Sequence, residues 1–229
     1  FARHDGAIAT TLEVFVSPED DAEVRRVSVA NSGSEVREID LTSYAELVLA
    51  PPAADTAHPA FSRLFVQTEY LAKPGVVVAT RRRRSSAEPE IWAAHLAVVE
   101  GEAVGEPEFE TDRARFLGRG REVRTPMAVV DGLPLSDTAG AVLDPVFALR
   151  RRLRVAPGRA AHVAFWTVVA SSRAEVLDLA DKHCDPTAFE RAATLAWTHA
   201  QVQQSYLGIS PEEASHFQRL AGRVLYADA

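Results

Sequence analysis

Cysteine is almost absent from this sequence, which has one, Cys184, in 229 residues. A single thiol cannot build an intrachain disulfide framework or a multi-cysteine metal site, so nothing in the sequence requires an oxidising compartment. Cys184 lies between His183 and Asp185 at an expected helix end. It is open to two interpretations, a reactive or metal-binding thiol and a half-buried structural cysteine. We expect the structural role.

Long apolar runs and an excess of positive charge are also missing. No segment approaches the roughly 18 apolar residues of a membrane-spanning helix, and no signal peptide precedes the first strand pattern. The 25 basic residues are outnumbered by 32 acidic ones, which gives a formal net charge of -7. Because phosphate-backbone binding needs clustered positive charge, nucleic acid is not an expected partner. We expect a soluble polypeptide without direct membrane contact.

Close groups of metal ligands and catalytic signature motifs are lacking as well. The seven histidines are scattered, without the close pairing of metal motifs, so no zinc site is expected. The sequence has no nucleophile elbow, phosphate-binding loop or dinucleotide fingerprint. The pair Gly118-x-Gly120 has no third glycine after it and is interpreted as a turn. We therefore expect neither a metal nor a cofactor.

An apolar alternation of period two dominates from Ala7 to about Ala170, and this spacing is typical of strands. Leu12 and Val14 begin it, and turn residues such as Lys73-Pro74-Gly75 separate its segments. Many strands joined by short turns predict an antiparallel sandwich. The further predicted strands are 23–31, 39–49 ending at Pro51-Pro52, 63–71, 76–82, 91–99, 146–155 and 161–169.

After Ser171 the apolar period changes to that of helices. The sequence therefore predicts a mainly β domain at residues 1–171 and an α-helical extension at 172–229. The helix signals are Ser172 with Glu175 for the first helix, Asp185-Pro186 and Gly208 for the second, and Ser210, Pro211 and Glu213 for the third.

Two further segments stand out from this pattern. Residues 81–84 are four consecutive arginines at an expected strand end. An anion or an acidic partner could bind there, but we expect a solvated loop because the whole chain is acidic. Residues 127–143 show neither period and are predicted to form a long irregular connection, the type of loop that often borders a site.

Three carboxylates alternate at Glu108, Glu110 and Asp112, which places them on one face of a strand at steps of roughly 7 Å. That spacing superficially suits the paired carboxyls of glycoside chemistry. Such a pair must face across a sugar, however, whereas residues of one strand point in parallel. We therefore expect a solvated strand edge.

Arginines follow these carboxylates at Arg113, Arg115, Arg119 and Arg121, with apolar Phe116 and Leu117 between them. Their guanidinium groups could donate to sugar hydroxyls, to a phosphate or to a carboxylate of a neighbouring domain. Pairing with Glu108, Glu110 and Asp112 is the alternative. The candidate ligand or domain-interface contacts in this run are Arg113, Arg115, Phe116 and Arg119.

Several stretches of this sequence together resemble one enzyme family. They are Val16-Ser17-Pro18-Glu19-Asp20-Asp21, Leu41-Thr42-Ser43-Tyr44-Ala45-Glu46, His58-Pro59-Ala60-Phe61, Glu110-Thr111-Asp112-Arg113-Ala114-Arg115-Phe116-Leu117-Gly118-Arg119-Gly120-Arg121 and Gly208-Ile209-Ser210-Pro211-Glu212-Glu213. In this order they resemble the cyclic β-1,2-glucan synthases, within the inverting disaccharide phosphorylases once called glycosyltransferase family 36, the glycoside hydrolase family 94 type.

The resemblance implies a galactose-mutarotase-like β-supersandwich, beginning partway through the domain, followed by linker helices. In that family an (α/α)6 barrel follows and holds the catalytic aspartate and the phosphate site. No catalytic residue is therefore carried over, and this chain is expected to be a non-catalytic fragment. The resemblance also implies an inner-membrane parent if that parent is a glucan synthase, and a cytoplasmic one if it is a phosphorylase.

The expected partners are the downstream barrel and a glucan or glucoside, with a homodimer left open. Aromatic residues make up only 7% of the chain, and Trp166 and Trp197 are expected to pack inside it. Trp92, near a strand start, is the candidate sugar contact. Two other functions stay open: an autonomous aldose-epimerase-like enzyme, and a pure dimerisation or docking module.

Overall fold

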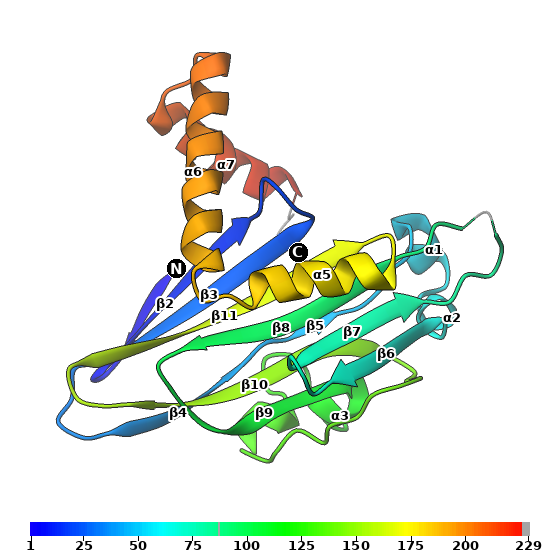
Figure 1. Cartoon of the computed structure of the whole chain (residues 1–229), viewed down its shortest axis with the longest axis horizontal. Helices are drawn as coiled ribbons and strands as arrows, with labels where there is room; N and C mark the ends of the chain where they lie inside the picture. The colour runs from blue at the N-terminus through cyan, green and yellow to red at the C-terminus, as the bar shows by residue number, and fades with distance from the viewer. Residues whose placement is uncertain (87, 226–229) are drawn as a thin grey trace.

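The computed structural model describes residues 1–86 and 88–225, and its centre is a sandwich of two antiparallel sheets (Figure 1). Within those residues the larger sheet has seven strands, in the order β1-β2-β3-β11-β8-β7-β6. Their bounds are Ala2–Asp5 (β1), Ile8–Val16 (β2), Ala22–Asn31 (β3), Arg159–Ala170 (β11), Trp92–Glu100 (β8), Val76–Arg81 (β7) and Val66–Leu71 (β6).

The smaller sheet is built around β10 (Pro145–Val155). Its other strands within the described residues are β4 (Arg37–Thr42), β5 (Ala45–Glu46) and β9 (Glu102–Asp112), and each of them pairs with β10. The pairings in both sheets are antiparallel. The predicted antiparallel β-sandwich is therefore confirmed.

Side chains on β11 alternate between two hydrophobic cores. Val163 and Phe165 lie in the core between the two sheets, whereas Trp166 and Val168 lie in a core on the other face of the larger sheet. This division follows from the strand geometry, because successive side chains point to opposite faces. Trp166 is fully buried, as predicted.

The outer core is closed by α5 (Arg173–His183), which lies across the larger sheet (Figure 1). The predicted helix start is confirmed, because the Ser172 hydroxyl accepts the backbone N–H of Glu175 at 3.2 Å. Val176 and Ala180 turn inward and pack with Trp166. The half-buried Cys184 ends this helix, and burial raises the pKa of its thiol.

The second helix, α6 (Ala188–Leu207), starts later than predicted. Asp185 accepts the Thr187 N–H at 2.7 Å and so stabilises a turn before the helix rather than its first residue. Gly208 ends α6 in the left-handed conformation, φ 65°, as predicted. The predicted start of α7 (Pro211–Leu225) is also confirmed, by a reciprocal pair of bonds between Ser210 and Glu213 at 2.8 and 3.2 Å.

The prediction that Trp197 packs inside the chain is wrong, since the residue is 66% exposed. Only the start of α6 reaches the sandwich, where Phe189 packs against Phe15 and beneath the guanidinium of Arg26. Beyond that point α6 rises away from the sheets (Figure 1).

Two predicted strands are shorter than expected. The strand predicted at 39–49 is interrupted after Thr42, and Leu49 has a left-handed φ of 47°, which an extended strand cannot accommodate. The strand predicted from Arg63 begins at Val66. Two short helices occupy the segment between these strands, one follows β9, and one lies at the start of the predicted irregular segment 127–143: α1 (Pro52–Ala57), α2 (Pro59–Arg63), α3 (Arg113–Leu117) and α4 (Met127–Val130).

In residues 1–86 and 88–225, no helix has the length and apolar character needed to span a bilayer. The division at 1–171 and 172–229 stays a prediction, and the end of its second part, 226–229, lies outside the described residues.

Candidate functional site

The segment singled out by the sequence, residues 110–121, leaves β9 and forms α3 beside the smaller sheet. Asp112 starts the helix by accepting the Ala114 N–H at 2.8 Å, and Gly118 ends it with a φ of 81°. Phe116 and Leu117 are buried, and the Phe116 ring stacks on Tyr44 with centroids 4.8 Å apart. These two apolar residues fix the segment to the sandwich.

The expected solvated position of Glu110 is wrong, because this side chain is 1% exposed. Its carboxylate accepts the backbone N–H groups of Thr111 at 2.9 Å and Asp112 at 2.8 Å, and also the hydroxyl of Ser136. The cause is the loop between α4 and β10, which covers this face of β9: its Leu135 bonds Glu108 and its Ser136 bonds Glu110. The two carboxylates do share a face, as predicted, but that face is covered by the loop rather than solvated.

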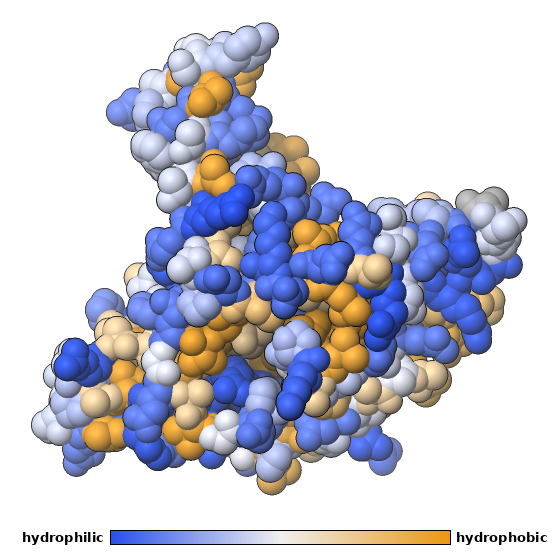
Figure 2. Space-filling model, viewed as in Figure 1, coloured by the Kyte–Doolittle hydropathy of each residue, from blue (hydrophilic) through white to orange (hydrophobic). Residues whose placement is uncertain are grey.

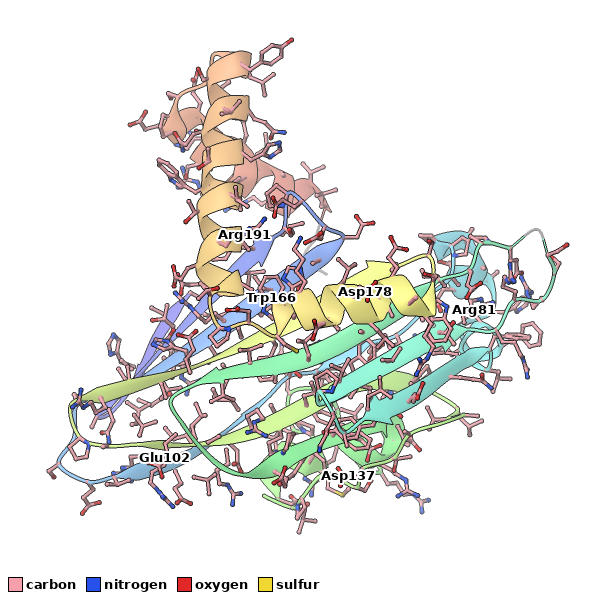
Figure 3. The ribbon with its side chains drawn as sticks, in the orientation of Figure 1. Arg81, Glu102, Asp137, Trp166, Asp178 and Arg191 are labelled. Atoms are coloured by element: carbon pink, nitrogen blue, oxygen red, sulfur yellow. The ribbon has the colours of Figure 1, made fainter. Side chains whose placement is uncertain are left out.

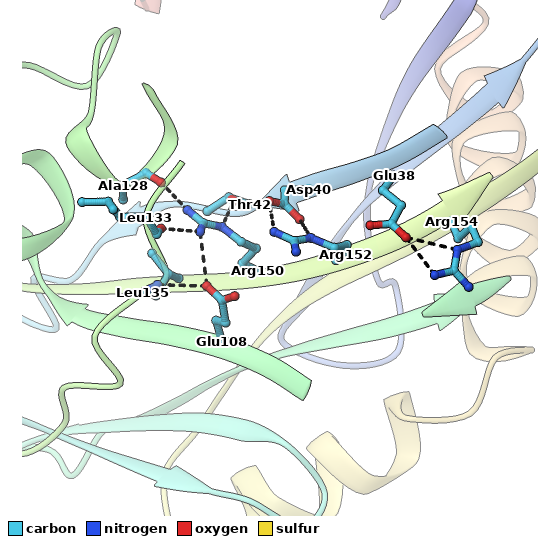
Figure 4. A network of polar contacts seen from close by, with 10 residues as sticks. All are labelled: Glu38, Asp40, Thr42, Glu108, Ala128, Leu133, Leu135, Arg150, Arg152 and Arg154. Atoms are coloured by element: carbon cyan, nitrogen blue, oxygen red, sulfur yellow. Dashed lines mark hydrogen bonds and ion pairs between the residues drawn. The ribbon is translucent and has the colours of Figure 1, made fainter. Parts of the chain in front are cut away.

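Glu108 is also bonded within the chain. Its Oε2 accepts the Leu135 N–H at 2.9 Å and lies 3.2 Å from Nη1 of Arg150 (Figure 4). Arg150 is 4% exposed and donates in addition to Thr42 and to the carbonyls of Leu133 and Ala128. The Arg150 side chain therefore joins β4, β9 and the connection that follows α4.

The same face of β10 continues outward as a ladder of ion pairs. Arg152 makes two bonds to Asp40, at 2.7 and 2.9 Å, and Arg154 pairs with Glu38 on β4 (Figure 4). Arg154 also pairs with Glu102 on β9. These side chains are partly exposed, and ion pairs of this kind contribute little to stability.

Glu110→Gln is expected to lower the free energy of unfolding by about 1–3 kcal/mol, because a neutral amide oxygen accepts the Thr111 and Asp112 N–H groups more weakly than a carboxylate, and the NH₂ takes the place of the oxygen that accepts the Ser136 hydroxyl. Urea unfolding measures the loss. Glu106→Gln, an exposed position on the same strand, is the control and should change stability by less than about 0.5 kcal/mol. Equal stabilities for the two variants would contradict the structural role of Glu110.

The arginines of the segment differ in how they are held. Nε of Arg113 lies 2.9 Å from Glu46, and its Nη1 lies 3.6 Å from Asp144, rather than pairing with the predicted Glu108 or Glu110. Glu46 also accepts the Tyr44 hydroxyl at 3.1 Å. The pKa of Tyr44 is raised to about 12, first by burial and then by this carboxylate.

Arg115 and Arg119 point into solvent. The exposed Arg115 lies 3.9 Å from the half-buried Asp112, which is a loose pairing. Arg119 is exposed in the turn after α3. Arg121, at the end of the segment, makes two bonds to Asp131, at 2.7 and 3.0 Å. Contact of Arg113, Arg115, Phe116 or Arg119 with a ligand or another domain stays a prediction.

Trp92 opens β8 and is half-buried. Its indole Nε1 donates to Glu90 at 2.7 Å, and the ring packs against the outer core. The predicted sugar contact of Trp92 also stays a prediction. Trp92 lies on β8 in the larger sheet, whereas residues 110–121 follow from β9 in the smaller sheet.

His95 is a polar group whose position the sequence pattern did not reveal. It borders a cavity of about 530 Å³ on the inner face of the larger sheet. Its Nε2 lies 2.8 Å from the Ser43 hydroxyl and its Nδ1 lies 2.9 Å from that of Thr167. Burial lowers the pKa of His95 to about 4, so the imidazole is neutral at pH 7. An alternating strand position gives no signal that distinguishes such a histidine from a surface one.

Comparison with known proteins agrees with the family resemblance of the sequence. The family model described as glycosyl hydrolase 94, supersandwich domain, matches residues 1–186. The chain is 40% identical over 228 residues to the cyclic beta-(1,2)-glucan synthase NdvB of Rhizobium meliloti (strain 1021), a match that covers 100% of this chain and 8% of that protein. It is 29% identical over 153 residues to the solabiose phosphorylase of Paenibacillus borealis, covering 67% and 19%.

Among solved structures, polysaccharide lyase BACCELL_00875 aligns with a TM-score of 0.43 and 14% identity, covering 77% of this chain and 23% of that one. The chain spans less than a fifth of the length of each of the two curated relatives described above.

Proposed function

This chain belongs to the glycosyl hydrolase 94 supersandwich-domain family, and on that premise we propose that it is a non-catalytic structural domain of a larger glucan-processing enzyme. The parent would be a cyclic β-1,2-glucan synthase or a related disaccharide phosphorylase. The relatives named above support this assignment of the parent.

One observation carries the non-catalytic role: the carboxylates that looked suited to glycoside chemistry are engaged in holding the fold. Glu110 is buried under the loop and bonded to backbone N–H groups, and Glu108 is paired with the buried Arg150. A general acid or nucleophile must face the sugar. Glu108 and Glu110 instead face their own loop and sheet.

The partner that fits this role is the (α/α)6 barrel of the same parent, docked on α6 and α7. The two helices project from the sandwich and expose large apolar side chains among polar ones (Figure 2). An exposed apolar surface of this kind is typical of a protein–protein contact. The exposed residues are Trp197, Val202, Tyr206 and Leu207 on α6, and Phe217, Leu220, Val224 and Leu225 on α7.

Trp197→Asp is expected to weaken association of this chain with the separately produced barrel segment by at least about tenfold, because buried aromatic anchors dominate interface energies. Calorimetric titration measures the change. Leu143→Asp, at an exposed apolar position away from the helices, is the matched control and should leave the affinity unchanged. Equal affinities for Trp197→Asp and the unmodified chain would contradict docking through α6.

Contact with the glycan itself is a second part of the proposal. Arg115 and Arg119 are exposed and can donate to hydroxyl groups, and Trp92 offers part of an aromatic face. Chemical-shift changes at these residues on addition of a β-1,2-linked glucan would support the contact. Chemical-shift changes confined to other residues would show that Arg115, Arg119 and Trp92 do not contact the glycan.

An aldose-epimerase-like activity is the second candidate function, and the His95 cavity is the observation that favours it. The neutral imidazole has the form of a general base, and hydroxyl groups lie on both sides of it. Both ring nitrogens are however occupied by Ser43 and Thr167, and Phe147 and Phe165 stack against the ring. These contacts favour a structural histidine.

A further inference from the structure

The four consecutive arginines at residues 81–84 do not form a uniform solvated loop. Arg81, the last residue of β7, is 8% exposed. It lies at the end of the sheet near α1 and α2 (Figure 3). Its Nη1 donates to the carbonyl of Ser62 and lies 3.4 Å from the Ser62 hydroxyl. The expectation of a solvated loop is therefore wrong for Arg81, because strand β7 carries it inside before the chain turns outward.

The charge of Arg81 is not matched by a nearby carboxylate. Within residues 1–86 and 88–225, no Asp or Glu oxygen pairs with this guanidinium at 4.0 Å or less, whereas Arg83 pairs with Glu90 at 3.9 Å and Arg84 with Glu88 at 2.9 Å. The ring of Phe65 lies 5.2 Å from the Arg81 guanidinium carbon. Removing a cation from water without a counterion is unfavourable, and a bound anion would offset this cost.

A cavity of about 420 Å³ lies beside this guanidinium. Arg81 and Arg84 both line it, but Arg82 and Arg83 do not. The remaining wall is mainly carbon from residues that include Leu49, Pro51 and Ile91. The volume falls within the range of small-molecule sites, about 300–1,000 Å³, and such sites combine apolar walls with a few charged groups.

Glu88 shows how the same loop can hold an oxyanion. One carboxylate oxygen accepts Nε of Arg84 at 2.9 Å and the other accepts the Arg84 backbone N–H at 3.0 Å. These bonds, led by the backbone one, lower the pKa of Glu88, and Arg81 adds a weaker effect. A ligand oxyanion could take the place of this half-buried carboxylate on Arg84 while gaining Arg81 as a second cation.

We propose that the cavity between Arg81 and Arg84 is a binding site for a phosphate group carried on an apolar body, either a small soluble ester or a lipid headgroup. Two guanidinium groups supply several N–H donors for the phosphate oxygens, and Leu49, Pro51 and Ile91 contact the body. The net charge of -7 makes general attraction of anions to the chain unfavourable, so binding must depend on this local geometry. The site does not depend on the docking role of α6 and α7.

The test is a calorimetric titration of this chain with inorganic phosphate, with phenyl phosphate, and with phosphatidylcholine vesicles that do or do not contain phosphatidylglycerol. We expect phenyl phosphate to bind more tightly than inorganic phosphate because its ring adds apolar contact. Arg84→Gln should weaken the phosphate ligand by about tenfold, the effect of one hydrogen bond to a charged group. Arg81→Gln should do the same, and the exposed Arg84 keeps the test valid if the Arg81 variant does not fold.

Arg83→Gln is the matched control, since it removes the same charge from the same run outside the cavity. It should change the affinity by less than about twofold. Glu88→Gln should strengthen binding, because it removes the internal anion from Arg84.

Arg84-dependent binding of phenyl phosphate would assign the site to a soluble ester, and Arg84-dependent binding of phosphatidylglycerol vesicles alone would assign it to a lipid. An equal loss in Arg83→Gln and Arg84→Gln, or no phosphate ligand bound at millimolar concentration, would overturn the proposal.

Discussion

Arg150→Met is expected to lower the free energy of unfolding by about 3–5 kcal/mol, because it removes a buried cation that serves several acceptors at once. Arg150 is 4% exposed and bonds Glu108, Thr42, the carbonyl of Ala128 in α4 and that of Leu133 in the connection that follows. Methionine fills a similar volume but leaves these acceptors without a donor. The substitution therefore removes more than one ion pair, because it also loosens α4 and the loop that follows it.

Arg152→Met provides a matched control two residues further along β10. Arg152 also bonds a carboxylate, that of Asp40, but its side chain is 45% exposed, so we expect a much smaller loss of stability than for Arg150→Met. Urea unfolding compares the two variants, and hydrogen exchange shows whether residues 127–135 lose protection in the Arg150 variant alone. Equal destabilisation by both substitutions would contradict the assigned role of Arg150.

The second large effect is an acid-induced loss of stability caused by His95. Burial lowers its pKa from 6.5 to about 4 in the folded chain. Below pH 6.5 His95 therefore binds a proton in the unfolded chain but not in the folded chain. The contribution of the neutral, buried His95 to the free energy of unfolding is fully present above this pH and falls as the pH drops toward about 4. The total loss is about 3 kcal/mol, at about 1.4 kcal/mol per pKa unit.

Unfolding free energies measured at intervals between pH 7 and about 4.5 would show this slope. His95→Gln keeps a hydrogen-bonding group toward Ser43 and Thr167 and should remove most of the slope, whereas exposed His199→Gln should retain it. A smaller slope of the same sign remains from His183, whose pKa burial also lowers. If His95→Gln shows the slope of the unmodified chain, His95 is not buried in its neutral form.

Carboxylates act in a different pH window and do not obscure the effect. Hydrogen bonding to Arg152 lowers the pKa of Asp40, and Arg113 lowers that of Glu46 against the opposing effect of burial. Their stabilising contributions are present above the ordinary carboxyl pKa of about 4 and are lost only as the pH falls through the lowered values. The slope between pH 6.5 and about 4.5 therefore reports the histidines.

Local patterns predicted the regular parts of this fold well. The alternation along β11 correctly indicated a strand, and the capping residues Ser172 and Ser210 correctly indicated helix starts. These signals depend on neighbours along the chain, which a sequence displays directly.

Features that depend on distant contacts were not predicted. The burial of Glu110 results from the loop residue Ser136, twenty-six residues further along the chain, which the strand alternation does not show. The exposure of Trp197 results from the direction in which α6 leaves the sandwich. The inward position of Arg81 depends on Ser62, nineteen residues away along the chain. In each case the deciding partner lies outside the local pattern.

The most direct test of the non-catalytic role is the rate at which α- and β-glucose interconvert in the presence of this chain, measured by NMR exchange. If the chain is non-catalytic, we expect the uncatalysed rate of interconversion at every protein concentration, for the unmodified chain and for His95→Gln alike. A rate that rises with protein concentration and returns to background in His95→Gln would contradict the account and establish a sugar-active site at the His95 cavity.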